Sequence, residues 1–102
     1  VTKPLRKLTE VNLEACSEIS SAVDKLNNFN NLDKIADSCK NIYRLERKAD
    51  KVFDKAVADI FENESNVMDI IRYKEVMMAL EFATDSCRKV ANVLEAVTVK
   101  YS

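Results

Sequence analysis

The chain has 102 residues and a net charge of −1; 32% of the residues are charged, one is proline, and none is glycine or histidine. Hairpins and tight turns depend on glycine and proline, so this composition argues against a β-rich fold and predicts an all-α protein. The intermixed charges lack the basic excess of nucleic-acid-binding domains, and the absence of histidine excludes most zinc sites, Ser-His-Asp and Cys-His nucleophilic systems, and the Glu-x-x-His motif of di-iron bundles.

The first helix is predicted over about residues 4–27. Proline is tolerated in the first turn of a helix, so Pro4 fits near its start. Asn12 interrupts an apolar stripe of helical spacing. The stripe consists of Leu5, Leu8, Ala15, Ile19, Ala22, Val23 and Leu26. The stretch "NNFNN" at 27–31 then predicts a turn, because asparagine favours helix caps and the left-handed geometry of helix ends.

The second helix is predicted over about residues 32–61, and the polar stretch "ENESN" at 62–66 predicts the turn that follows it. Apolar residues recur along it in steps of three and four, as an amphipathic helix requires. They are Leu32, Ile35, Cys39, Ile42, Ala49, Phe53, Val57 and Ile60. The opposite face is basic and is expected to be solvated. It carries Arg44, Arg47, Lys48, Lys51 and Lys55.

The third helix is predicted over about residues 67–100 and contains two series of apolar residues with a seven-residue period. One series is Tyr73, Leu80, Cys87, Leu94 and Tyr101, and the other is Val76, Ala83, Val90 and Val97. Together they predict a bundle seam of the coiled-coil type. Because short turns make sequential helices antiparallel neighbours, residues 1–102 are expected to form a single elongated up-down-up three-helix bundle.

Two acidic pairs share a four-residue spacing: Glu46–Asp50 in "ERKAD" and Glu81–Asp85 in "EFATD". Carboxylates four residues apart lie on one helix face and repel unless a positive group lies between them. Hard cations prefer carboxylate oxygen, so the four residues are candidate metal ligands. Glu46 falls inside the apolar stripe of its helix, where an ionised carboxylate must be paired or metal-bound. Arg88 from another helix is the alternative partner.

The second pair belongs to a polar stripe on the third helix that steps by four, three, four and three residues. The stripe is Glu81, Asp85, Arg88, Asn92 and Glu95. It is expected to point away from the apolar seam. Such a stripe is typical of a solvent-facing side, and it also suits a surface for a metal or a second domain.

The three cysteines are too few and too far apart for a disulfide framework. Their odd number and spacing indicate the reduced, small-hydrophobe use of cysteine in a cytosolic protein. No apolar run approaches the roughly 18 residues of a membrane span. The chain begins at Val1 rather than at methionine, as a fragment of a longer protein would.

The segments "LERKADKVFDKAVADIF" and "DIIRYKEVMMALEFATDSCRKVANVLEAVTVK" resemble the PhoU-like phosphate transport regulators, in the branch linked to Pit-type transporters. The hallmark of that family is Glu/Asp-x-x-x-Asp, matched here by Glu46–Asp50 and by Glu81–Asp85. The resemblance covers most of residues 42–100 and is weak over the first helix. It implies one half of a fold built from two tandem three-helix bundles, with this chain matching the C-terminal half.

For function, the resemblance implies a non-enzymatic regulator or accessory protein of phosphate uptake. Its metal ligands would be Glu46, Asp50, Glu81 and Asp85, holding iron clusters or other hard divalent cations. It would be cytoplasmic or peripheral to the inner membrane. Its partners would be a phosphate transporter or the transporter's regulatory machinery, with a second bundle or a homo-oligomer. A metal-free helical interaction or dimerisation module is the alternative, and a carboxylate-bridged metalloenzyme is disfavoured by the absence of histidine.

Overall fold

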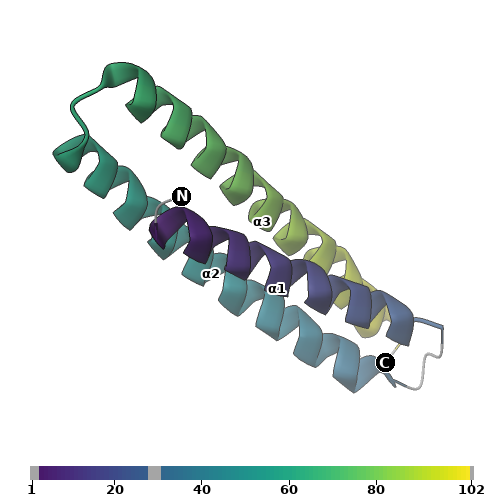
Figure 1. Cartoon of the computed structure of the whole chain (residues 1–102). Helices are drawn as coiled ribbons and strands as arrows, with labels where there is room; N and C mark the ends of the chain where they lie inside the picture. The colour runs from purple at the N-terminus through teal and green to yellow at the C-terminus, as the bar shows by residue number, and fades with distance from the viewer. Residues whose placement is uncertain (1–2, 28–30, 102) are drawn as a thin grey trace.

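A computed structural model describes residues 3–27 and 31–101, and over these residues the chain is entirely helical apart from its turns. The helices are α1 (Lys3–Lys25), α2 (Leu32–Asn63) and α3 (Val67–Tyr101), and each packs against the other two. They run up, down and up in a bundle of 55 × 19 × 16 Å (Figure 1). The prediction of an elongated all-α three-helix bundle is therefore confirmed. Because α1 is the shortest helix, α2 and α3 continue past its N-terminus as a two-helix extension.

Each turn shows how its sequence stops a helix. α1 ends at Lys25, two residues before the expected 27, in a tight turn where the Leu26 N–H donates to Val23 O at 3.0 Å. Residues 28–30, the centre of the predicted "NNFNN" turn, lie outside the described residues. At the second turn, the Asn66 side chain caps α3 by accepting the Asp69 N–H at 3.2 Å. The turn predicted from "ENESN" is thus confirmed as residues 64–66.

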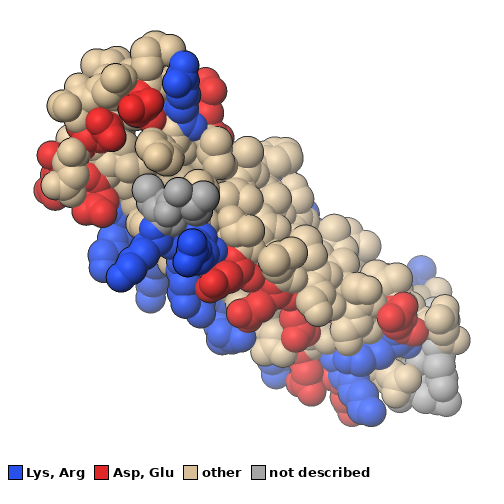
Figure 2. All heavy atoms as spheres, viewed as in Figure 1, with Lys and Arg blue, Asp and Glu red and all other residues tan. Residues whose placement is uncertain are grey.

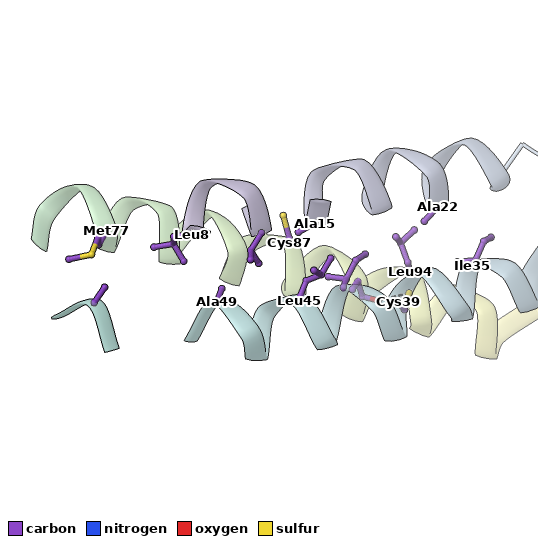
Figure 3. Close-up of a cluster of buried hydrophobic side chains, with 14 residues drawn as sticks. Leu8, Ala15, Ala22, Ile35, Cys39, Leu45, Ala49, Met77, Cys87 and Leu94 are labelled. Carbon is purple, nitrogen blue, oxygen red and sulfur yellow. Dashed lines mark hydrogen bonds between the residues drawn. The ribbon is translucent and has the colours of Figure 1, made fainter. Parts of the chain in front are cut away.

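The core is a line of small and medium apolar side chains contributed by all three helices (Figure 3). Its largest fully buried apolar members are Leu8, Val11, Ile35, Ile42, Leu45 and Met77. Alanines occupy many of the remaining buried positions, which lets the helix axes approach closely. Burial of this line supplies the main driving force for folding.

The two seven-residue series predicted for α3 differ in how well they face the core. In the first, Cys87 and Leu94 are buried and Tyr73 and Leu80 are half-buried, as predicted, whereas Tyr101 is exposed. In the second, Val76 and Val90 remain 47% and 40% exposed, which contradicts the prediction, and Ala83 and Val97 are half-buried. The inward positions are instead one residue further along the chain. They are Met77, Thr84, Ala91 and Thr98.

The reason for this shift is that α3 carries apolar residues on its outer side as well as its inner side, so periodicity alone does not select the buried face.

Two threonines can lie in the core because the hydroxyl group of each donates a hydrogen bond to a backbone carbonyl of its own helix. Thr84 Oγ1 donates to Leu80 O at 2.9 Å, and Thr98 Oγ1 donates to Glu95 O at 2.7 Å. Apolar as α3 is, none of the helices in the described residues is long and apolar enough to span a membrane.

Candidate metal centre

The two acidic pairs face each other across the packed surfaces of α2 and α3. Glu46 and Asp50 come from α2, and Glu81 and Asp85 come from α3. Asp50 and Glu46 of α2 both lie close enough to Glu81 to raise the pKa of its carboxyl. The charge of Asp85 acts in turn on Glu46. These four residues are called the four-carboxylate cluster below.

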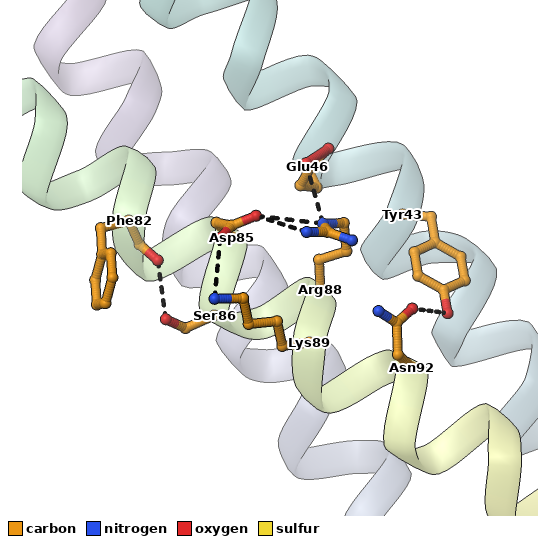
Figure 4. A network of polar contacts seen from close by, with 8 residues as sticks. All are labelled: Tyr43, Glu46, Phe82, Asp85, Ser86, Arg88, Lys89 and Asn92. Carbon is orange, nitrogen blue, oxygen red and sulfur yellow. Dashed lines mark hydrogen bonds and ion pairs between the residues drawn. The ribbon is translucent and has the colours of Figure 1, made fainter.

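This position corrects the prediction that the polar stripe of α3 points away from the seam. Glu81 and Asp85 flank the buried side of α3 and face α2. The stripe lies about a quarter turn from the core, because residues 81 and 85 each follow an inward-facing residue, the half-buried Leu80 and the buried Thr84. Asn92 of the same stripe also reaches α2, where its Oδ1 accepts the Tyr43 hydroxyl at 2.7 Å (Figure 4). Sequence reasoning missed this hydrogen bond.

Arg88 joins the two helices by bridging a carboxylate from each (Figure 4). Its Nε lies 3.4 Å from Glu46 Oε1, and its Nη2 lies 3.0 Å from Asp85 Oδ1. Lys89 Nζ lies 3.7 Å from the other oxygen of Asp85. The Glu46 side chain is only 15% exposed, so its charge requires a partner. The alternative expected for Glu46, an arginine from another helix, is confirmed.

The carboxyl groups differ in their protonation because their surroundings differ. Hydrogen bonding from Arg88 lowers the pKa of Asp85. Burial raises the pKa of Glu46, and the neighbouring Asp50 adds to that rise while Arg88 opposes it. Burial, followed by the hydrogen bond with Asp50, raises the pKa of Glu81 to about 8. Near neutral pH the Glu81 carboxyl therefore holds a proton, and the Arg88 guanidinium places a full positive charge between Glu46 and Asp85.

The cluster fits a hard cation by its donor chemistry, although its side chains are not arranged as a coordination shell. No three acidic or thiol side chains among residues 3–27 and 31–101 converge to hold a metal ion as they lie. One oxygen is nevertheless buried without a hydrogen-bond partner, Glu81 Oε2. Such an atom is costly unless a proton donor or a cation meets it. The position between Glu46 and Asp85 that a cation would use is taken by the Arg88 guanidinium.

Comparison with curated proteins finds similarity to the UPF0111 protein YkaA of Bacillus subtilis (strain 168), with 32% identity over 87 residues. This chain is a distant homologue of part of that protein. The matched region covers 85% of the chain and 42% of the relative, so the chain spans less than half the length of YkaA. No protein-family profile matches the chain.

A shallow pocket of about 350 Å³ gives solvent access to the four-carboxylate cluster from the α3 side. Phe53, Met78 and Phe82 form its apolar wall, and Glu81 and Asp85 form its acidic wall. A larger hollow of about 430 Å³ lies elsewhere, between the N-terminal turns of α1 and the basic side of α2, and contains none of the four carboxylates.

Proposed function

We propose that the chain is a non-enzymatic, PhoU-like regulator or accessory protein of phosphate transport that binds metal through Glu46, Asp50, Glu81 and Asp85. The observation that carries the metal half is a buried oxygen of Glu81 that has no hydrogen-bond partner, on a carboxyl group that Asp50 and Glu46 of the facing helix also influence. Distant homology to a UPF0111 protein and the two Glu-x-x-x-Asp motifs support the regulatory half.

The metal in this proposal is a hard cation, with iron clusters first and other hard divalent ions second, because every donor is a carboxylate oxygen. On binding, Glu81 would lose its proton, and Arg88 would turn away from Glu46 and Asp85. A bound cation would supply the positive charge that holds α2 and α3 together at this level of the bundle. No nucleophile or general base is assigned, because the proposed role is regulatory.

The proposed partners are a phosphate transporter or the transporter's regulatory machinery at the inner membrane face, so the proposed location is cytoplasmic or peripheral to that membrane. A second three-helix bundle or a homo-oligomer completes the proposal. The length of YkaA beyond the matched region leaves room in that relative for another unit of similar size.

Elemental analysis of protein purified from iron-supplied cells tests the metal half. The site variant is Asp50→Asn/Glu81→Gln, and the matched control is Glu10→Gln/Glu14→Gln, which removes two exposed acids of the same spacing from α1. We expect stoichiometric metal in the parent and the control, and loss of it in the site variant. A parent protein free of metal would end the metal proposal. Phosphate uptake by cells with and without the gene tests the regulatory half.

A metal-free interaction module is the second candidate, and one observation favours it. Arg88 already neutralises Glu46 and Asp85, so these two carboxylates are satisfied without any metal. In that case the cluster is an interhelical latch that fixes the register of α2 against α3. The same elemental analysis separates the candidates, because the latch predicts a folded parent protein without metal.

A further inference from the structure

The first turns of α1 and the basic side of α2 line a hollow of about 430 Å³ that combines an apolar floor with a charged rim. The floor consists of the buried Ala56 and the half-buried Pro4 and Val52. The rim carries four exposed cationic side chains, which are Lys3, Arg6, Lys7 and Lys55. This hollow is called the basic hollow below. Its size and its apolar floor are typical of a site for a small molecule.

The charges around the basic hollow do not cancel. Its four cations share the rim with two acids, Glu10 and Asp59, which leaves an excess of two positive charges. Among the described residues, neither acid forms an ion pair with a cation of the hollow. Asp59 Oδ1 instead accepts a hydrogen bond from Asn63 Nδ2 at 3.1 Å. The cations of the hollow therefore remain available to a negatively charged ligand.

The charge pattern of α1 adds to this positive excess. The N-terminus of a helix carries a partial positive charge and favours acidic residues. α1 has no acidic residue in its first turn, and three of its first five residues are cationic. Figure 2 shows basic side chains gathered beside this end of α1. Like charges in this position repel one another and oppose the helix dipole, and an anion in the hollow would relieve both effects.

We propose that the basic hollow binds a small organic phosphate, with the phosphate group held by the cations of the rim and the organic part lying on the apolar floor. A phosphate monoester carries about two negative charges near pH 7, which matches the excess charge of the rim, whereas a single carboxylate would neutralise half of it. The guanidinium of Arg6 is suited to bind two phosphate oxygens at once, and the lysines supply further positive charge. A bare phosphate ion would leave Val52 and Ala56 uncovered.

This inference goes beyond the proposed function and does not depend on it. The basic hollow contains none of the four carboxylates and requires no metal. A ligand in the hollow would connect α1 with α2, whereas the four-carboxylate cluster connects α2 with α3. Loss of metal binding and loss of phosphate binding are therefore separate results, and either can fail without the other.

Titration calorimetry of the intact chain with phenyl phosphate near neutral pH tests the site. The site variant is Arg6→Gln/Lys55→Gln, and the matched control is Lys40→Gln/Arg44→Gln, which removes one lysine and one arginine from exposed positions of α2 outside the hollow. We expect one phenyl phosphate per chain in the parent and the control, and a dissociation constant raised on the order of 10-fold or more in the site variant. Circular dichroism should show equal helix content in all three. A parent without saturable binding, or equal weakening in the two variants, would overturn the proposal.

Three further probes test the class of ligand. Benzenesulfonate has the same ring with a single negative charge, and orthophosphate has the charge without the ring, so both should bind the parent more weakly than phenyl phosphate does. Affinity equal to that of phenyl phosphate would contradict the charge match in the first case and the role of the apolar floor in the second. Vesicles of phosphatidylcholine with phosphatidic acid present the same phosphate group on a lipid. Binding to these vesicles without binding of phenyl phosphate would make the basic residues a membrane-contact surface and overturn the small-molecule site.

Discussion

The guanidinium of Arg88 on α3 lies against the largely buried carboxylate of Glu46 on α2, with Nε 3.4 Å from Oε1. The same guanidinium is held by Asp85 one turn earlier on its own helix, with Nη2 at 3.0 Å. Asp85 therefore fixes the arginine side chain in the position from which it neutralises Glu46. This relationship links the two Glu-x-x-x-Asp motifs through a residue that belongs to neither of them.

Replacing Arg88 with glutamine should destabilise the bundle in a pH-dependent way. Without the cation, the Glu46 carboxylate is left among Asp50 and Asp85, and its pKa rises further. Protonation of Glu46 relieves the repulsion, so the loss should be larger at about pH 7 than at about pH 4. Urea unfolding of Arg88→Gln and of Arg44→Gln, an exposed α2 arginine, measures the difference. Equal midpoint shifts in the two variants would contradict this role.

Glu81 gives the protein a second pH dependence with a defined sign. Its pKa is about 8 in the folded chain, against an ordinary value of 4.5. Between these values the folded state binds more protons than the unfolded state, so the contribution of Glu81 to stability is lost as the pH rises through about 8. Glu81→Gln should flatten this slope and exceed the parent in stability at about pH 8. Glu75→Gln, at an exposed site on the same helix, is the control, and an unchanged slope in Glu81→Gln would refute the assignment.

The sequence was sufficient to predict the fold, because its signals agree. The absence of glycine, the asparagine-rich interruptions and the strong amphipathicity of the second segment all point to three long helices. The sequence also singled out Glu46, because this acidic residue falls in the apolar stripe of its helix and its charge needs a partner. Both partners named for it, a metal and Arg88, were chemically reasonable, and the structure was needed to show that Arg88 forms an ion pair with it.

The face of α3 could not be predicted by the same reasoning. Valines and alanines lie on both sides of this helix, and the two seams differ by a single residue in register. The buried seam contains Thr84 and Thr98, which a hydrophobic pattern does not select, and these residues fit only because each hydroxyl bonds to its own helix. The direction in which Glu81 points depends on the same choice of register. The prediction that it points away from the other helices was therefore wrong for the same reason.

Two adjacent methionines test the corrected register. Met77 is 1% exposed and Met78 is 51% exposed. Met77→Ala leaves a cavity in the core and should lower the free energy of unfolding by about 2–5 kcal/mol, whereas Met78→Ala should lower it by about 0.5 kcal/mol or less. Denaturant unfolding at matched protein concentration measures both. Similar losses at the two positions would show that position 77 does not face the core.

The reactivity of the cysteine thiols can be used to test the contact between α1 and α3, because Cys16 of α1 lies beside Cys87 of α3. Cys16 is exposed, whereas Cys39 and Cys87 are buried. Burial, followed by the neighbouring Cys16, raises the pKa of Cys87 from 9.0 to about 11, which lowers its thiolate fraction at about pH 8 roughly 100-fold. A disulfide reagent should therefore modify one thiol rapidly, and the other two only as fast as the bundle opens. Cys16→Ser should abolish the fast phase of modification, and Cys39→Ser should retain it. Two rapidly modified thiols in the parent protein would mean that α1 separates readily from α3. Cys87 would then not be held in the core.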